Sequence, residues 1–311
     1  MYRKKYEKYK KKLRDLSQSF FDGRLLRFQN GKTVYYQDIG KRWKFRTNDI
    51  GFQLLMQCHT MTSALLQKNQ KLMKKKYGKK AKQELEKGRD MYTEKKSLGT
   101  KGVTWTREEY AHLGLQYYYL TVKSFQRFTE IWSLLERSYH ANVFDNVPDK
   151  MVVCSIGGGP GFEGFVWKCF FQRHFPSKEF HFHVLDLELL WGEYASEWDK
   201  RITFEQWDLR KDDIYAAIGE SKIDYIIISN VLCMYMMNDH SYDFLARVLF
   251  QGTQSILINS RSKIMGAREE MTKRGVHTSS LISDDERQCV LSKKKHTVKN
   301  FDPVFPNVPW S

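Results

Sequence analysis

The spacing of hydrophobic positions changes near residue 150. From Met151 onward, short apolar runs alternate with longer, helix-like stretches. The seven runs cover residues 151–156, 180–185, 202–207, 225–229, 255–259, 276–282 and 287–291. Strands that alternate with helices form a parallel sheet with helices on both faces, so we expect an α/β fold with a doubly wound, mostly parallel, seven-stranded sheet. A short turn separates the last two runs, which predicts a terminal hairpin with an antiparallel edge strand.

The first half of the chain has mainly the spacing of helices, preceded by short β-like pieces. Two such pieces flank Asn30-Gly31, a dipeptide typical of two-residue hairpins. Residues 51–95 then carry apolar side chains at helical spacing. Farther on, Thr106 and Glu109 have the spacing of a capping box, which predicts that a long helix begins there.

Charge divides the chain at the same place as the hydrophobic pattern. Residues 1–150 contain 33 Lys and Arg against 15 Asp and Glu, whereas residues 151–311 contain 19 against 21, within a net charge of +16. Basic residues gather in an N-terminal arm, 1–16, and in a cluster at 71–80, with aromatic residues between them. Such a region is typical of polyanion binding, and we expect it to contact RNA. The alternative is a solvated, lysine-rich surface that aids solubility.

Composition excludes several classes of protein. Hydrophobic residues make up 41% of the chain and aromatic residues 14%, which excludes a wholly disordered chain. No apolar run approaches the roughly 20 residues of a membrane helix, and the Lys-rich start differs from a secretory signal. The five cysteines have no C-x-x-C spacing, which favours a reducing compartment. We expect an intracellular protein, in the nucleus or cytoplasm, without membrane attachment.

A glycine-rich segment follows the first run of the second half. Gly157, Gly158, Gly159 and Gly161 lie between a predicted strand and a predicted helix. Glycines permit a sharp turn and let a ligand lie against the backbone, and free amides at the helix start favour an anionic group. The spacing is G-x-G-x-G and differs from the dinucleotide pattern, because Phe162 stands where a glycine would be needed. No Gly-Lys-Ser/Thr follows, which excludes a P-loop.

Polar residues end the next three predicted strands. Asp186 follows the second strand, where a carboxylate can accept hydrogen bonds from both hydroxyls of a ribose. Asp208 follows the third, where a short polar side chain can bind an adenine amino group. Asn230 follows the fourth, at the edge where ligands bind in such sheets. Each position also suits a turn or a helix cap, which is the alternative role.

Together these residues resemble the class I S-adenosylmethionine-dependent methyltransferases, over about residues 150–295. SIGGGPG is similar to the first motif of that superfamily, and SNVLCMY, which contains Asn230, is similar to the fourth. The resemblance implies a Rossmann-like seven-stranded sheet with a reversed last strand and S-adenosyl-L-methionine as cofactor, but it points to no specific member. The implied cofactor-binding residues are Ser155, Gly157, Gly158, Gly159, Gly161, Asp186, Asp208 and Leu209.

The chain departs from the superfamily at two positions. Ser155 stands two residues before the first glycine, where the superfamily often has an acid that contacts the cofactor's amino group. Asn230, the candidate catalytic residue, is not followed by the Pro-Pro-Tyr/Phe of many amino-group methylases. We expect three regions: a basic, mainly helical region at 1–148, a methyltransferase-like catalytic domain at 149–295, and an irregular tail at 296–311.

Three functions remain open at this point. The first is a methyltransferase that acts on RNA held by the basic region. The second is a protein or small-molecule methyltransferase whose basic region serves folding or targeting. The third is a catalytically inactive, methyltransferase-like subunit that binds RNA or a protein partner. We expect no metal site, because His181 and His183 have no acidic or cysteine residue near them in the sequence.

Overall fold

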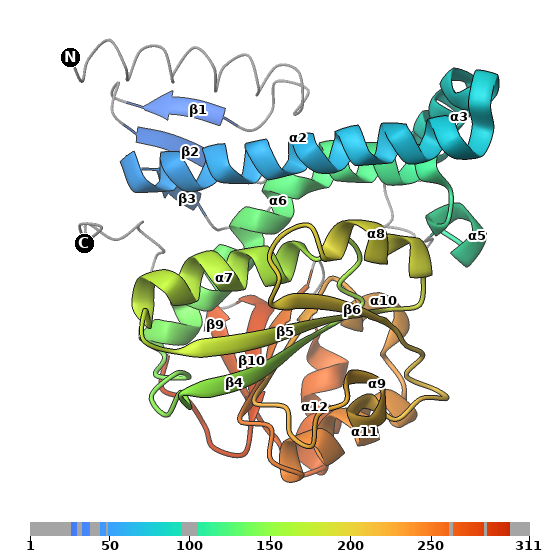
Figure 1. Ribbon diagram of the computed structural model, residues 1–311. Coiled ribbons are helices and arrows are strands. Elements are labelled where there is room, and N and C mark those ends of the chain that lie inside the picture. Colours follow the sequence, from blue (N-terminus) through green and yellow to red (C-terminus); the bar gives the residue numbers. More distant parts are fainter. Residues whose placement is uncertain are drawn as a thin grey trace.

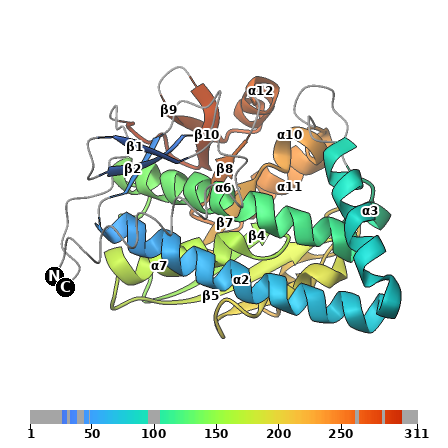
Figure 2. The same ribbon diagram turned by 90° about the horizontal axis from the view of Figure 1, so that it is seen from above.

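A seven-stranded sheet forms the centre of the molecule, with helices on both sides (Figures 1 and 2). The computed structural model describes residues 26–29, 33–37, 44–47, 49–94, 105–260, 264–282 and 285–298. The N-terminal arm, the Asn30-Gly31 dipeptide and most of the C-terminal tail lie outside these residues. The strands of the sheet are β4 (Lys150–Ile156), β5 (Glu179–Asp186), β6 (Ile202–Gln206), β7 (Tyr225–Ser229), β8 (Ser255–Asn259), β9 (His277–Ile282) and β10 (Asp285–Ser292).

The sheet has the strand order β6-β5-β4-β7-β8-β10-β9, and all seven predicted strands are confirmed. The first five strands pair in parallel, whereas β10, the last of the described strands, runs antiparallel to both β8 and β9. The predicted terminal hairpin with an antiparallel edge strand is confirmed: β9 forms the edge and pairs antiparallel with β10. The middle of β10 is buried at consecutive residues, Cys289 to Leu291, whereas β9 alternates buried and partly exposed residues. The more apolar strand therefore takes the inner position.

Helices cover the two faces of the sheet in separate layers (Figure 1). One face shares a hydrophobic core with α6 (Leu113–His140), α7 (Phe162–His174) and α8 (Gly192–Ala195). The other face shares a second core with α9 (Ile214–Ile218), α11 (Asp239–Phe250) and α12 (Met265–Lys273). Short helical turns follow two strands, namely η2 (Leu189–Trp191) after β5 and α10 (Leu232–Tyr235) after β7. The strand order and the reversed β10 are those of the class I methyltransferase fold, as the resemblance implies.

The N-terminal region is mainly helical, as predicted. The expected helix over 51–95 is present as α2 (Asp49–Tyr77) and α3 (Ala81–Glu94), joined by a 3₁₀ turn, η1 (Gly78–Lys80). Before it, β1 (Leu26–Gln29), β2 (Thr33–Gln37) and β3 (Lys44–Thr47) form a separate antiparallel sheet, which confirms the predicted hairpin pairing. Among the described residues, no helix is long and apolar enough to cross a membrane.

The long helix does not begin at the predicted residue, because a separate one-turn helix precedes it. Thr106 and Glu109 do form a capping box, but it opens only the one-turn helix α5 (Arg107–Tyr110). The long helix α6 begins separately, with His112 as its N-cap. The other ring nitrogen of His112 bonds Glu84 on α3 at 2.9 Å. Gly88 on α3 then packs directly on the backbone of Gly114, so this close helix crossing sets where α6 begins.

The N-terminal helices are docked on the sheet region by a buried polar contact. Asn69 on α2 donates one amide to the carbonyl oxygen of Leu113 at 3.0 Å and to the Tyr194 hydroxyl at 2.7 Å. That hydroxyl donates in turn to Gln116 on α6 at 3.0 Å. Apolar residues of α2 and α6 also share one core with the sheet. The predicted boundary at 148/149 thus falls between segments that pack together, and it stays a prediction.

Candidate functional site

The glycine loop joins β4 to α7 at the carboxyl edge of the sheet. Gly157, Gly159 and Gly161 have φ angles of 65°, 51° and 83°, in the left-handed region that favours glycine. The amides of Gly157 and Gly158 donate to the carbonyl oxygen of Leu185 at 2.8 and 3.2 Å, which ties the loop to β5. The loop therefore makes the sharp turn that the sequence predicts.

The glycine loop is tightly packed on one side and has free space on the other. A side chain at Gly158 would place its Cβ 2.2 Å from the hydroxyl of Ser155, so the loop is closed toward the sheet. At Gly159 the nearest atom to such a Cβ, on the Trp191 ring, is 4.0 Å away. The loop is therefore open beside Gly159, where a ligand can lie against the backbone.

Asp186 lies beside the loop, as predicted. Its two carboxylate oxygens accept from the amides of Gly159 at 2.9 Å and Glu188 at 3.0 Å. Burial raises the pKa of Asp186 to about 6, because it disfavours the charged form more than these two hydrogen bonds favour it. Each oxygen keeps a lone pair for a further donor, so the carboxylate can still accept the two hydroxyls of a ribose.

Three buried polar atoms near the loop have no hydrogen-bond partner among the described residues. They are the hydroxyl of Ser155, one carboxylate oxygen of Glu163 and the amide oxygen of Asn230. Glu163 lies at the start of α7, and burial raises its pKa to about 7 despite the nearby charge of Arg127. Buried polar atoms without partners point to a missing ligand or water. Glu163 also brings to this region a carboxylate, the group that Ser155 does not supply.

These residues fit S-adenosylmethionine. The cofactor carries a ribose, an adenine and a cationic amino group. Asp186 offers acceptors for the ribose, Gly159 an open stretch of backbone, and Glu163 an acceptor for the amino group. Glu163 is therefore a candidate cofactor residue that the sequence analysis missed. Its only signal was a lone carboxylate two residues after the last glycine of the motif.

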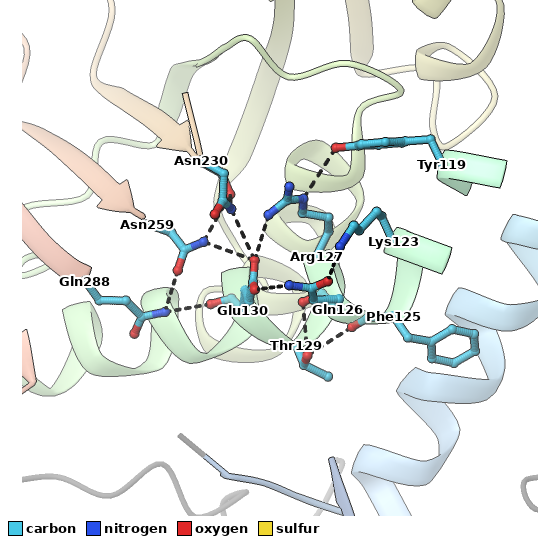
Figure 3. Close-up of polar contacts among 11 residues, drawn as sticks. Tyr119, Lys123, Phe125, Gln126, Arg127, Thr129, Glu130, Asn230, Asn259 and Gln288 are labelled. Carbon is cyan, nitrogen blue, oxygen red and sulfur yellow. Dashed lines mark hydrogen bonds and ion pairs between the residues drawn. The ribbon is translucent and has the colours of Figure 1, made fainter. Parts of the chain in front are cut away.

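A buried carboxylate on α6 lies behind this edge of the sheet (Figure 3). Glu130 is fully buried, and one of its oxygens accepts from Arg127 at 2.9 Å and from Asn230 and Asn259 at 3.2 Å each. Its other oxygen accepts from Gln126 at 2.7 Å. The sequence analysis missed this cluster, because its members come from α6 and from the ends of two distant strands.

Asn230, the candidate catalytic residue, is held by that cluster. It directly follows β7 and has a φ of 61°, uncommon outside glycine. Its side-chain nitrogen donates to the Glu130 carboxylate at 3.2 Å and to the Ser229 hydroxyl at 3.1 Å, and its backbone amide donates to the backbone carbonyl of Asn259 at 2.6 Å. The two bonds of the side-chain nitrogen orient the amide group, and its oxygen has no partner among the described residues. The strained backbone suits a turn or a functional position equally.

Asp208 and Leu209 lie at the end of the neighbouring strand. The backbone amide of Trp207 donates to the carbonyl of Asp186 at 2.9 Å, so the two strand ends are adjacent. Arg210 contacts the Asp208 carboxylate at 3.2 and 3.3 Å and, above all other causes, lowers its pKa. Leu209 packs at the margin of the second core. Asp208 already has a partner in its own turn, and its role toward adenine stays a prediction.

Comparisons with known proteins agree with this reading of the fold only in outline. No protein-family model matches the chain, and no curated protein matches it. Among solved structures, the chain is similar to the CMeT domain of the citrinin polyketide synthase, with 10% identity and a TM-score of 0.44 over 94% of this chain and 79% of that one.

Two further structures are similar to parts of the chain. A putative class I S-adenosylmethionine-dependent methyltransferase from Listeria monocytogenes has 12% identity and a TM-score of 0.39 over 79% of this chain and 82% of that one. A TehB-like SAM-dependent methyltransferase from Corynebacterium glutamicum has 17% identity and a TM-score of 0.37 over 50% of this chain and 87% of that one. Because these scores are below 0.5, the fold assignment rests on the strand order and the reversed β10.

Proposed function

We propose that this protein is an S-adenosylmethionine-dependent methyltransferase that acts on RNA. The observation that supports cofactor binding best is the contact between Asp186 and the amide of Gly159, at the open side of the glycine loop. It joins two predicted cofactor residues 27 positions apart in the chain. The partnerless oxygens of Ser155, Glu163 and Asn230 lie in the same part of the molecule.

The chain's residues would position the reactants. When bound, the cofactor supplies a methyl group already activated on a sulfonium, so the protein mainly has to orient and desolvate. Asp186 would accept hydrogen bonds from the ribose hydroxyls, and Glu163 would accept one from the amino group. The amide oxygen of Asn230, held by the Glu130 contact, would accept a hydrogen bond from an exocyclic amine and leave the nitrogen lone pair free to attack.

The proposed RNA contact rests on the lysine cluster at the junction of α2 and α3. Seven lysines there are exposed: Lys71, Lys74, Lys75, Lys76, Lys79, Lys80 and Lys82. Within the described part of the chain, none of the seven forms an ion pair, so their charge is available to phosphates.

The cluster is also connected to the cofactor side of the sheet. Lys68, one helical turn before it, contacts Glu197 at 2.7 Å and Glu193 at 3.4 Å in the α8 region. Trp191, which directly precedes α8, is the side chain nearest the open side of Gly159. A strand of RNA on the lysine cluster would therefore have a short path to the glycine loop.

Two measurements test the proposal. Calorimetry with S-adenosylmethionine should show binding by the wild type that Asp186→Ala loses, and labelled cofactor should transfer its methyl group to RNA. Cofactor binding without transfer to RNA would favour an inactive subunit, and transfer to protein or small molecules would remove RNA as substrate. No cofactor binding at all would contradict the enzyme proposal.

The lysine cluster is tested by salt dependence. The triple variant Lys74→Gln, Lys75→Gln, Lys76→Gln should reduce the slope of log affinity for single-stranded RNA against log salt by about 2. The matched control neutralises three other exposed consecutive lysines, Lys293, Lys294 and Lys295. Equal losses in both triple variants would mean that overall charge, rather than this cluster, binds RNA.

A further inference from the structure

Two histidines and a glutamate meet on the sheet face that carries α9. His181 and His183 lie two residues apart on β5 and so project to the same face of the sheet. Glu220 follows the end of α9, just before β7. One potential ligand atom from each of the three side chains lies within 4.8 Å of the other two. The sequence showed only the histidine pair, because the acid comes from 37 positions farther along the chain.

His183 has the surroundings of a metal ligand. Its side chain is buried, with 1% exposed, and its Nε2 has no hydrogen-bond partner among the described residues. Its Nδ1 lies 3.0 Å from the hydroxyl of Thr203 on β6. Histidine ligands usually donate their second ring nitrogen to such an outer partner, which fixes the tautomer and leaves the first nitrogen free to bind the ion.

His181 and Glu220 leave the space between the three side chains accessible to solvent. The side chains of His181 and Glu220 are 42% and 37% exposed, and the His181 Nδ1 lies 3.5 Å from a carboxylate oxygen of Glu220. The rings of the two histidines are 4.1 Å apart, centre to centre. An ion could therefore enter from water without displacing the core.

We propose that His181, His183 and Glu220 bind a Zn²⁺ ion. Two imidazoles and one carboxylate are a ligand set that zinc takes, with water at the fourth, open position. The ion would join β5 to the connection between α9 and β7. Asp186 lies three to five residues farther along β5, or about 10–17 Å along the strand. The zinc site is thus separate from the cofactor site and independent of the proposed methyl transfer.

The test uses the untagged, full-length chain after removal of metal with a chelator. Zinc titrated by calorimetry should bind with a stoichiometry of one, and Zn²⁺ should raise the melting temperature. Co²⁺ in place of zinc should give the strong visible absorption of a four-coordinate site. His181→Asn and Glu220→Gln, both at partly exposed positions, should each weaken zinc binding at least tenfold, roughly the loss seen when a metal site loses a supporting group.

Matched controls separate this site from adventitious binding. His277→Asn and Glu86→Gln alter an exposed histidine and an exposed glutamate elsewhere and should leave zinc affinity unchanged. Thr203→Val should weaken binding about tenfold while keeping all three ligands. Melting temperatures of all variants in chelator report whether they fold. The proposal is overturned if the folded wild type binds no zinc, or if His181→Asn and Glu220→Gln bind it as tightly as the controls do.

Discussion

Polar groups lie toward both ends of β5, and the two groups differ in their hydrogen-bond partners and in their exposure to solvent. At its carboxyl end, Asp186 accepts from the backbone amides of Gly159 in the glycine loop and of Glu188, and a buried cluster around Glu130 contacts the ends of β7 and β8. Toward its amino end, His181 and His183 face Glu220 through side chains alone, and the side chains of His181 and Glu220 are partly exposed. The first region therefore contributes to the stability of the fold, whereas His181 and Glu220 in the second can change with little effect on the core.

The largest expected effect is at Arg127. Its guanidinium is buried and contacts Glu130, so Arg127→Met leaves a carboxylate in the interior without its cation. We expect the free energy of unfolding to fall by about 3–5 kcal/mol, measured by urea denaturation. The double variant Arg127→Met, Glu130→Gln should recover part of this loss, because no unpaired charge remains. A loss below about 1 kcal/mol in the single variant would show that the pair is not needed for folding.

The next effect concerns Glu163, whose raised pKa of about 7 links stability to pH. The folded state keeps this proton at pH values where the unfolded chain has lost it, so its stabilising contribution is full below about pH 4.5 and is lost as the pH rises through about 7. Glu163→Gln removes that loss. The variant should be more stable than the wild type by about 1–3 kcal/mol at pH 8, with the difference shrinking toward pH 5.

Urea denaturation of both proteins at pH 5 and pH 8 measures this difference. Glu86→Gln, an exposed glutamate on α3, is the control and should give parallel curves. A Glu163 variant that is equally destabilised at both pH values would mean that the carboxylate is charged and paired in the folded state.

A smaller effect is expected for cofactor affinity as a function of pH. Asp186 must be ionised to accept both ribose hydroxyls, and its pKa is raised to about 6. Affinity for S-adenosylmethionine should therefore be about tenfold lower at pH 5 than at pH 7. Asp186→Asn should bind weakly at both pH values, and calorimetry measures each constant. A wild-type affinity that does not change between pH 5 and pH 7 would separate this carboxylate from the cofactor.

The smallest effects belong to the amino end of β5. In chelator, His181→Asn and Glu220→Gln should change the free energy of unfolding by no more than about 0.5 kcal/mol, because their side chains lie at the surface. Their affinity for S-adenosylmethionine should equal that of the wild type. If either variant lowered the free energy of unfolding as much as Arg127→Met does, the two ends of β5 would not differ in their contribution to stability.

Local patterns were enough to predict the sheet and the loop at its carboxyl edge. The run from Tyr225 to Ser229 and the run from Ser255 to Asn259 are strands with the predicted bounds, because buried central strands are continuously apolar. The glycine loop and Asp186 could be found because a βα turn places its ligand groups close together in sequence or directly after a strand.

What the sequence did not show depends on distant contacts. Glu130 looks like one more polar residue in a long helix, and its partners Asn230 and Asn259 lie at least 100 positions away. Glu220 is separated in the same way from the two histidines. The capping box at Thr106 was real, but the crossing of α3 and α6 decided where the long helix begins. Local signals predict elements, and tertiary contacts decide their junctions.

The position of β10 has a consequence for how the protein is made. β9 leaves the ribosome before β10, its neighbour in the sheet, has been synthesised. Until then β8 also has an open edge, which other chains can pair with. β10 then delivers Gln288, which donates to Asn259 at 3.1 Å and to the backbone of Glu130 at 3.0 Å. A growing chain thus has its glycine loop early, but the polar cluster behind Asn230 is completed only after β10 has emerged.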